Sequence, residues 1–380
     1  MRGGEDHHKA WSPAALVDEV DVVDVVDIAP SFSVHSVHSV HTVHLVHAER
    51  SIMPGHGGDC IRHFRDTRSR SRSRSRSRLL LFLSILLASC TYSEHRLETL
   101  AGRTTTDAGS ASVSLDDRLF GFTGRFTGVL RADRFNRVLG FWIFLRGPHR
   151  RDRVPVVLIH GHTTGPRPLA ELAESLDPER FEPWYCYYAT GIEIDRSSVL
   201  LRRSLAETAS RYNENRVIVI AYSFGGLVAR QALLDTEEAV DFPDVPLFIT
   251  VATPWNGSDA NRFETDRTFA PGSWFDIHVG SYFLTHLFDR RLPESTAFHM
   301  VYSFDSRDRR RIPGDDDGVI AGWSLARPEA VAEARSVTYI PETHHLDVIR
   351  HPRTIARVGV LLEEFWESRR STAPVPGDGL

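Results

Sequence analysis

The sequence predicts an α/β fold in which helices cover a mostly parallel central sheet. Short apolar runs alternate with amphipathic segments along residues 141–366, and repeated strand, helix, strand units form parallel sheets through right-handed crossovers. The run at 217–220 (VIVI) has no polar alternation, which indicates a strand buried on both faces. With 380 residues, of which 41% are hydrophobic, the chain can bury one large core or two small ones.

Residues 1–78 are not expected to join that core. The segment 20–47 contains VDVVDVVDIA and VHSVHSVHTVHLVH, and such three-residue repeats give neither a helical nor a strand-like apolar face. We expect a disordered extension, or one that is not translated, with Met53 as an alternative start. The histidine-rich tract could bind a metal, although it has no Cys or Asp partners nearby.

A signal peptide is predicted next. The Arg-Ser run at 70–78 precedes the apolar run LLLFLSILLASC at 79–90, which is too short to span a bilayer and follows positive charge. Its end, LASC at 87–90, resembles the bacterial lipobox, which implies that Cys90 is acylated and becomes the mature amino terminus. We therefore expect a lipid-anchored protein of the bacterial cell envelope, facing the outer membrane or periplasm, and a secreted protein if Cys90 is not processed.

Charge and cysteine content exclude two other classes. The formal net charge is −5, and removal of the signal segment leaves a mildly acidic chain, so no basic face for nucleic acid is expected. Processing would remove Cys60 and lipidate Cys90, which leaves Cys186 without a partner. A disulfide framework is therefore excluded.

The remaining chain divides into a tether and a domain. Residues 91–114 are rich in Ser, Thr, Gly and Ala, a composition typical of a flexible tether, and the ordered domain is expected at 115–380. Apolar runs predict strands at 141–146, 154–160, 181–189, 217–221, 245–253, 297–304 and 335–340. Helical spacing of apolar residues predicts helices at 168–176, 197–212, 227–234 and 354–368.

The interval 254–296 breaks this alternation. It is rich in Trp, Phe, Gly and Pro, follows a predicted strand, and is too long for an ordinary connection. We expect a cap or lid over a site at that end of the sheet, with an irregular surface excursion as the alternative.

A serine stands where such a site would lie. AYSFGG at 221–226 follows the buried run and places Ser223 at the carboxyl end of a strand, where open α/β sheets bind ligands. The small residues Ala221 and Gly225 permit a sharp turn into a helix, which is the geometry of a nucleophile elbow. The alternative is a serine that only caps the helix, but a cap requires neither the buried strand nor the glycines.

Five motifs occur in one order along the chain, and together they resemble the α/β-hydrolases, specifically the lipases and esterases found among bacterial lipoproteins. They are HG at 160–161, AYSFGG at 221–226, TPWNGS at 253–258, DDDGVI at 315–320 and THHLDVIRHP at 343–352. The resemblance covers about residues 141–366 and implies the α/β-hydrolase fold. One departure is Ala221, where the family usually has glycine, which adds one methyl group at a crowded turn.

The resemblance implies a Ser-Asp-His triad. Ser223 would be the nucleophile and His345 the base, because aliphatic residues and a proline follow His345 at the family's spacing. His344 is the fallback for the base. Asp317 would be the orienting acid, since it directly precedes Gly-Val, and the chain order Ser, Asp, His is the one expected of this fold.

Other residues near these motifs allow further interpretations. Asp315 and Asp316 adjoin the predicted acid and could instead hold a cation. The resemblance implies oxyanion donors in the backbone N–H groups of Phe224 and His162. His160, two residues before His162, could alternatively form a metal pair with it, although no third ligand is evident.

The resemblance thus implies a serine hydrolase that cleaves carboxylic esters, with an ester or lipid as substrate, no cofactor, no metal, and membrane attachment through Cys90. Amide hydrolysis or acyl transfer on the same fold is an alternative. So is a non-catalytic envelope scaffold, because fold alone does not determine function. The sequence predicts neither the acyl-chain length nor the oligomeric state.

Overall fold

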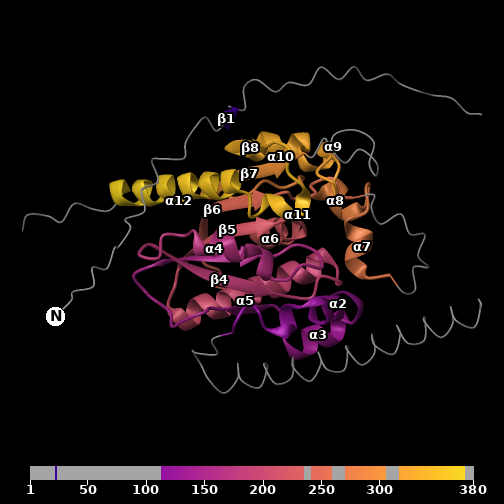
Figure 1. The fold of residues 1–380 in the computed structure, drawn as a ribbon, viewed down its shortest axis with the longest axis horizontal. Helices are drawn as coiled ribbons and strands as arrows, with labels where there is room; N and C mark the ends of the chain where they lie inside the picture. Colours follow the sequence, from indigo (N-terminus) through magenta and orange to yellow (C-terminus); the bar gives the residue numbers. More distant parts are fainter. Residues whose placement is uncertain (1–21, 24–112, 235–240, 259–269, 305–315, 373–380) are drawn as a thin grey trace, which may run out of the picture. The chain divides into compact units, whose positions relative to one another are not determined.

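A computed structural model describes residues 22–23, 113–234, 241–258, 270–304 and 316–372 (Figure 1). Its strands form one sheet in the order β1-β8-β7-β6-β5-β3-β4-β2. Their bounds are β1 Val22–Val23, β2 Trp142–Phe144, β3 Val154–Ile159, β4 Phe181–Tyr187, β5 Arg216–Tyr222, β6 Asp244–Val251, β7 Ala297–Ser303 and β8 Ser336–Ile340. The inner strands are parallel, whereas β2 and β1 pair antiparallel at the two edges. The predicted mostly parallel sheet is therefore confirmed.

The helices of the described residues follow the strands in the expected alternation. They are η2 Arg118–Phe120, α2 Phe122–Leu130, α3 Ala132–Val138, η3 Arg167–Leu169, α4 Ala170–Glu174, α5 Ile194–Tyr212, α6 Phe224–Leu234, α7 Gly272–Asp276, α8 Tyr282–His286, α9 Gly322–Leu325, α10 Pro328–Glu333, α11 His345–Val348 and α12 Pro352–Thr372.

The direction of the connections reverses at β3. The chain passes from β3 through α4 to β4, and then returns through α5 to β5 on the other side of β3. Because such crossovers are right-handed, the reversal places α4 and α5 on opposite faces of the sheet. It also makes the carboxyl ends of β3 and β5 the topological switch point, where ligands bind in open α/β sheets.

Burial of the central strands explains their composition. All six residues of β3 are buried, and so is β5 after its first residue. Since helices cover both faces, neither face requires polar side chains, and uninterrupted β-branched runs result. The partly exposed α12 reaches the same core through Trp366, whose ring lies edge-on to Phe181 with ring centroids 5.8 Å apart.

Several of the described helices were not predicted, and α2 and α3 are the longest of them. Helix α2 contains Gly124 and Gly128, which disfavour helix formation in isolation. Tertiary contacts favour the helices instead: Phe135 lies against Tyr187 of β4, with ring centroids 5.1 Å apart. Gly128 also lets α2 approach the chain after β4, since a Cβ there would lie 3.4 Å from the Cα atom of Ala189.

Other predictions need correction in detail. The helix predicted at 168–176 is a 3-10 turn followed by the short α4. The described part of the domain begins at Val113, which is buried and lies two residues before the predicted boundary.

The segment predicted to lie outside the core contributes one short element. Two residues, Val22–Val23, pair with Val337 and Thr338 of β8, whose edge offers unpaired backbone groups. The rest of that segment, together with Met53, the signal peptide and Cys90, lies outside the described residues.

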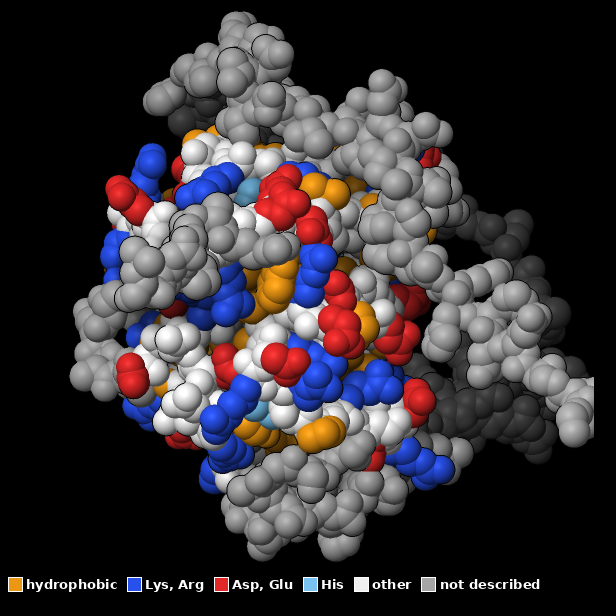
Figure 2. All heavy atoms as spheres, turned by 90° about the vertical axis from the view of Figure 1, so that its left-hand side faces the viewer, with side chains coloured by type: hydrophobic (Ala, Val, Ile, Leu, Met, Phe, Trp, Pro, Cys, Tyr) orange, Lys and Arg blue, Asp and Glu red, His pale blue; other side chains and the backbone are white. Residues whose placement is uncertain are grey.

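The surface agrees with the charge balance of the sequence. On the face shown in Figure 2, acidic and basic side chains of the described residues are interspersed, with no broad area of one sign. Within the described part of the chain, no helix combines the length and the apolar character required to cross a membrane.

Candidate active site

The turn between β5 and α6 has a strained serine. Ser223 has a φ angle of +53°, in the left-handed region that non-glycine residues rarely adopt. Its N–H donates to the carbonyl of Val251 (2.8 Å), and its own carbonyl accepts from the N–H of Gly226 (2.9 Å). These backbone bonds hold the turn, and the hydroxyl points to the carboxyl edge of the sheet.

Close packing explains the small residues around this turn. A Cβ atom on Gly225 would lie 2.6 Å from the carbonyl oxygen of His160, and one on Gly226 would lie 2.0 Å from Oγ1 of Thr253. Both positions therefore require glycine. Ala221 is fully buried and sits in regular parallel register between β3 and β6, so the fold accommodates the extra methyl group.

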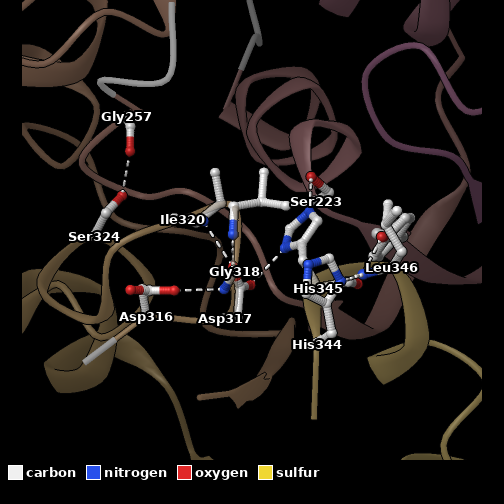
Figure 3. A network of polar contacts seen from close by, with 12 residues as sticks. Ser223, Gly257, Asp316, Asp317, Gly318, Ile320, Ser324, His344, His345 and Leu346 are labelled. Atoms are coloured by element: carbon white, nitrogen blue, oxygen red, sulfur yellow. Dashed lines mark hydrogen bonds and ion pairs between the residues drawn. The ribbon is translucent and has the colours of Figure 1, made fainter. Parts of the chain in front are cut away.

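Three predicted residues meet at this edge (Figure 3). Nε2 of His345 lies 2.9 Å from Oγ of Ser223, and Nδ1 lies 2.5 Å from Oδ2 of Asp317. The side chain of Asp317 is fully buried, and the other two residues are at most 7% exposed. Imidazole thus lies between a hydroxyl and a carboxylate, in a site largely closed to water.

The second carboxylate oxygen of Asp317 is also satisfied. It accepts hydrogen bonds from the backbone N–H groups of Val319 (3.0 Å) and Ile320 (2.7 Å). Such bonds stabilise the ionised form of a buried carboxyl group. They also fix its orientation, which leaves Oδ2 directed at His345.

Backbone contacts position His345 as well. Its N–H donates to the carbonyl of Asp317 (2.7 Å), and its carbonyl accepts from the hydroxyl of Tyr222 (2.8 Å). Burial raises the pKa of Tyr222 well above its usual value, so the phenol stays a neutral donor. Tyr222 lies inside the serine motif, but the sequence offered no reason to assign it this contact.

The neighbouring acid and histidine have different partners. Nδ1 of His344 accepts from the N–H of Leu346 (3.2 Å) at the start of α11. A carboxylate oxygen of Asp316 accepts from the N–H of Gly318 (2.6 Å). Both side chains therefore order loop backbone, and in Figure 3 the ring of His344 bonds to Leu346, whereas that of His345 bonds to Ser223.

The described residues do not support the alternative in which the neighbouring aspartates hold a cation. Asp315 lies outside the described residues, whereas Asp316 and Asp317 bond to backbone N–H groups. In the described ranges, no group of three or more His, Cys, Asp or Glu residues is arranged to hold a metal ion.

The loop after β3 lies directly against the serine. A Cβ atom on Gly161 would stand 2.9 Å from Cβ of Ser223, so only glycine lets this backbone approach so closely. The ring of the next residue, His162, lies edge-on to Phe224 with centroids 5.4 Å apart. Phe224 opens α6, where the first N–H groups have no partner within the helix. Both predicted oxyanion donors therefore flank Ser223.

Both histidines of this loop are neutral. Burial lowers the pKa of His160 and of His162 to about 4. Nδ1 of His160 lies 2.8 Å from the carbonyl oxygen of Gly161, which can only accept, so Nδ1 carries the proton. Nε2 of His162 instead faces Oγ of Ser273 at 3.3 Å. The two rings bond to separate partners, which does not favour the metal pair.

The described part of the interval 254–296 packs against α5 and the start of α10, and its Ser273 contacts His162. Asp276 of α7 accepts from the N–H of Ile194 (2.7 Å), and Arg327 donates to the carbonyls of Trp255 (3.2 Å) and Leu284 (2.7 Å). Residues 259–269 lie outside the described residues. A lid function for this interval stays a prediction.

Part of the chain is similar to a described family and to a curated protein. Residues 188–291 match the family described as "Putative serine esterase (DUF676)"; this match includes Ser223 and ends before Asp317. A "Lysosomal thioesterase PPT2 homolog" of Drosophila melanogaster is 27% identical over 159 residues, which are 39% of this chain and 45% of the relative. The chain thus matches less than half the length of that relative.

Solved structures are similar at lower sequence identity. The lin2722 gene product of Listeria innocua shares 17% identity, with 56% of this chain and 95% of that chain covered and a TM-score of 0.44. The mature lipase BlEst2 of Bacillus licheniformis also shares 17%, with 60% and 97% covered and a TM-score of 0.44. A parallel sheet that reverses direction at β3 and ends β5 in a left-handed serine is the arrangement of the α/β-hydrolase fold, and this chain has that fold.

Proposed function

We propose that this protein is a serine hydrolase that cleaves carboxylic esters through an acyl-enzyme on Ser223. The observation that carries the proposal is the unbroken line of hydrogen bonds from Ser223 through His345 to the buried Asp317. The family model that covers Ser223 is described as a serine esterase, and the fly relative is named a thioesterase, which supports the ester class.

The site contains a suitable chemical group for each step of the reaction. Oγ of Ser223 attacks the ester carbonyl carbon while Nε2 of His345 takes the hydroxyl proton, and Asp317 stabilises the resulting imidazolium. The backbone N–H groups of Phe224 and His162 donate to the oxygen that becomes negative. The C–O bond then breaks, and His345 returns the proton to the leaving alcohol.

Water completes the cycle by the same route. His345 removes a proton from a water molecule that attacks the acyl carbon, and then protonates Oγ of Ser223 as the acid departs. Attack by an alcohol in place of water would give acyl transfer, and attack on an amide would give amide hydrolysis. An acceptor alcohol and an amide substrate therefore belong in the same assay.

Labelling by a fluorophosphonate probe tests the nucleophile. The wild-type protein should be labelled on Ser223, and Ser223→Ala should lose labelling and reduce kcat for p-nitrophenyl esters by on the order of 10⁵-fold or more. Ser303→Ala is the matched control, since Ser303 is also a buried serine at a strand end. Activity of Ser223→Ala above a tenth of wild type would contradict the assignment.

Thioester hydrolysis is a second candidate, favoured by the name of the fly relative. A panel of p-nitrophenyl esters from short to long chains, run beside acyl thioesters of equal chain length, separates the two. A protein that the probe never labels and that cleaves none of these substrates would instead be a non-catalytic envelope protein.

We also propose that Cys90 is lipidated and anchors the domain to the cell envelope. The support is the apolar run that ends in LASC at 87–90, and acyl chains contribute about 0.8 kcal/mol for each buried CH₂ group. In a bacterial host, the full chain should enter the membrane fraction, and Cys90→Ala should release it or leave it uncut. Mass spectrometry that finds an unmodified peptide across residues 89–90 in the mature protein would overturn the anchor.

A further inference from the structure

The side chains of the two candidate oxyanion donors touch, and a third residue completes the cluster. The imidazole of His162 lies edge-on to the ring of Phe224. On its other side, Nε2 of His162 faces Oγ of Ser273, which belongs to α7 in the predicted cap interval. Three segments distant in the sequence thus meet at one partly buried ring.

The polarity of the His162–Ser273 contact follows from burial. Desolvation lowers the pKa of His162 to about 4, with a hydrogen bond to the backbone of Thr190 acting in the opposite direction. A neutral imidazole has one N–H. The backbone hydrogen bond to Thr190 raises the pKa of His162, so in this bond the imidazole N–H donates to the Thr190 carbonyl. Nε2 is then the acceptor, and the hydroxyl of Ser273 is the donor.

The surrounding structure leaves Ser273 little freedom. Its side chain is fully buried, and its carbonyl accepts from the N–H of Ile277 (3.0 Å). Asp276, one turn later in α7, accepts from the first N–H of α5 at Ile194. Because α7 is held by these contacts, its serine is a fixed donor rather than a mobile one.

The loop that Ser273 contacts is itself strained. Thr163, next to His162, has a φ angle of +59°, and its N–H donates to Oγ1 of Thr190 (3.3 Å). A residue in this region persists only when neighbouring contacts stabilise it. Thr190 supplies such a contact from the end of β4, and Ser273 supplies one from α7.

We propose that Ser273 is a positioning residue: its hydrogen bond to His162 holds the loop after β3 so that the N–H groups of His162 and Phe224 point at the developing oxyanion. This inference rests on the proposed function of the site. It makes α7 part of the apparatus that stabilises the transition state, so that the placement of α7 controls kcat more than substrate binding.

A matched pair of variants tests the role. Ser273→Ala removes the donor to His162, whereas Ser281→Ala removes the hydroxyl that bonds to the carbonyl of Asp276 (2.6 Å) and caps α8. Both loosen the same segment, but only the first touches the loop. Ser273→Ala should lower kcat by about tenfold, less than the full loss of one oxyanion donor, with KM within about twofold, and Ser281→Ala should retain wild-type kcat.

Two further measurements distinguish a role of Ser273 in positioning the loop after β3 from a role in packing alone. A boronic acid that mimics the tetrahedral state should bind Ser273→Ala about tenfold more weakly, in step with kcat. In a double-mutant cycle, His162→Phe keeps the ring contact with Phe224 and loses the acceptor, so adding Ser273→Ala to it should change kcat no further.

The outcomes are distinguishable. If Ser273→Ala and Ser281→Ala lower kcat equally, or if the two changes add fully in the cycle, the positioning role is wrong. Those results presuppose a wild-type protein that the fluorophosphonate probe labels on Ser223. An unlabelled wild-type protein would overturn the proposed function itself, and with it this role.

Discussion

The two halves of the site are built in different ways. In the elbow at 217–226, one short stretch supplies the strand, the left-handed serine and the glycines that its packing requires. The acid and the base stand on loops after β7 and β8, and they reach the serine only because those loops bond to each other, as from the N–H of His345 to the carbonyl of Asp317. The nucleophile is encoded locally, whereas the base and acid depend on long-range assembly.

The paired histidines give the strongest test of this difference between the locally encoded nucleophile and the base assembled from distant loops. His345→Ala should lower kcat by on the order of 10⁵-fold or more, as triad members generally do, because it alone bonds to Oγ of Ser223. His344→Ala should stay within about tenfold of wild type, since only one imidazole can occupy the position between nucleophile and acid. Steady-state kinetics on one p-nitrophenyl ester decides, and the reverse result would move the base by one residue.

The paired aspartates give the next largest effect. Asp317→Asn should lower kcat by about 10⁴-fold, because an amide cannot stabilise the imidazolium of His345. Asp316→Asn keeps an oxygen that can accept from the N–H of Gly318 and should lower kcat less than tenfold. Equal losses of kcat in both variants would show that catalysis depends on the conformation of the loop rather than on the carboxylate of Asp317.

A glycine substitution tests the packing of the elbow at 217–226. Gly225→Ala should destabilise the protein by about 1–3 kcal/mol, because the added methyl meets the carbonyl oxygen of His160. Gly359→Ala in α12 is the control, since a Cβ there meets nothing within 4 Å and should stabilise the helix by up to about 1 kcal/mol. Urea unfolding measures both. An unchanged free energy of unfolding in Gly225→Ala would contradict the close packing of Gly225 against His160.

A smaller effect concerns pH and the loop between the two halves. Burial lowers the pKa of His160, His162 and His299 to about 4 from 6.5, so between these values the unfolded chain binds more protons. Stability is therefore complete above about pH 6.5 and falls as the pH falls toward 4. Between pH 7 and 5.5 we expect a loss of about 1 kcal/mol for each of these histidines.

The measurement is the unfolding free energy across this pH range. His162→Phe should reduce the loss between pH 7 and 5.5 by about 1 kcal/mol, because it deletes one of the three imidazoles whose pKa is lowered to about 4. His278→Ala, which changes a ring at the surface, should leave the slope as it is. An unchanged pH dependence in His162→Phe would contradict the neutral state of His162 on which the Ser273 hydrogen bond depends.

Periodicity predicted most of the fold correctly and failed where tertiary contacts outweigh local preference. The seven predicted strands and the long α5, α6 and α12 are present because buried strands and amphipathic helices leave strong patterns. The helix α2 was missed because Gly124 and Gly128 weaken its local signal, and contacts with β4 and the residues after it stabilise both α2 and α3. The short α9, α10 and α11 contain too few turns for a period to be seen.

By itself, the sequence determined which chemical groups are available and their order: a serine after a buried strand, then acids before Gly-Val, then a histidine pair. The resemblance pointed to Asp317 and His345 within these groups, but only the tertiary structure brings His345 to Ser223 and Asp317 to His345, because the direction of a side chain on a loop depends on how the loop closes. The contact between Ser273 and His162, which are 111 residues apart in the chain, likewise leaves no local pattern. Residue types are local properties, whereas distances between them are set by the register of the sheet and the packing of the helices upon it.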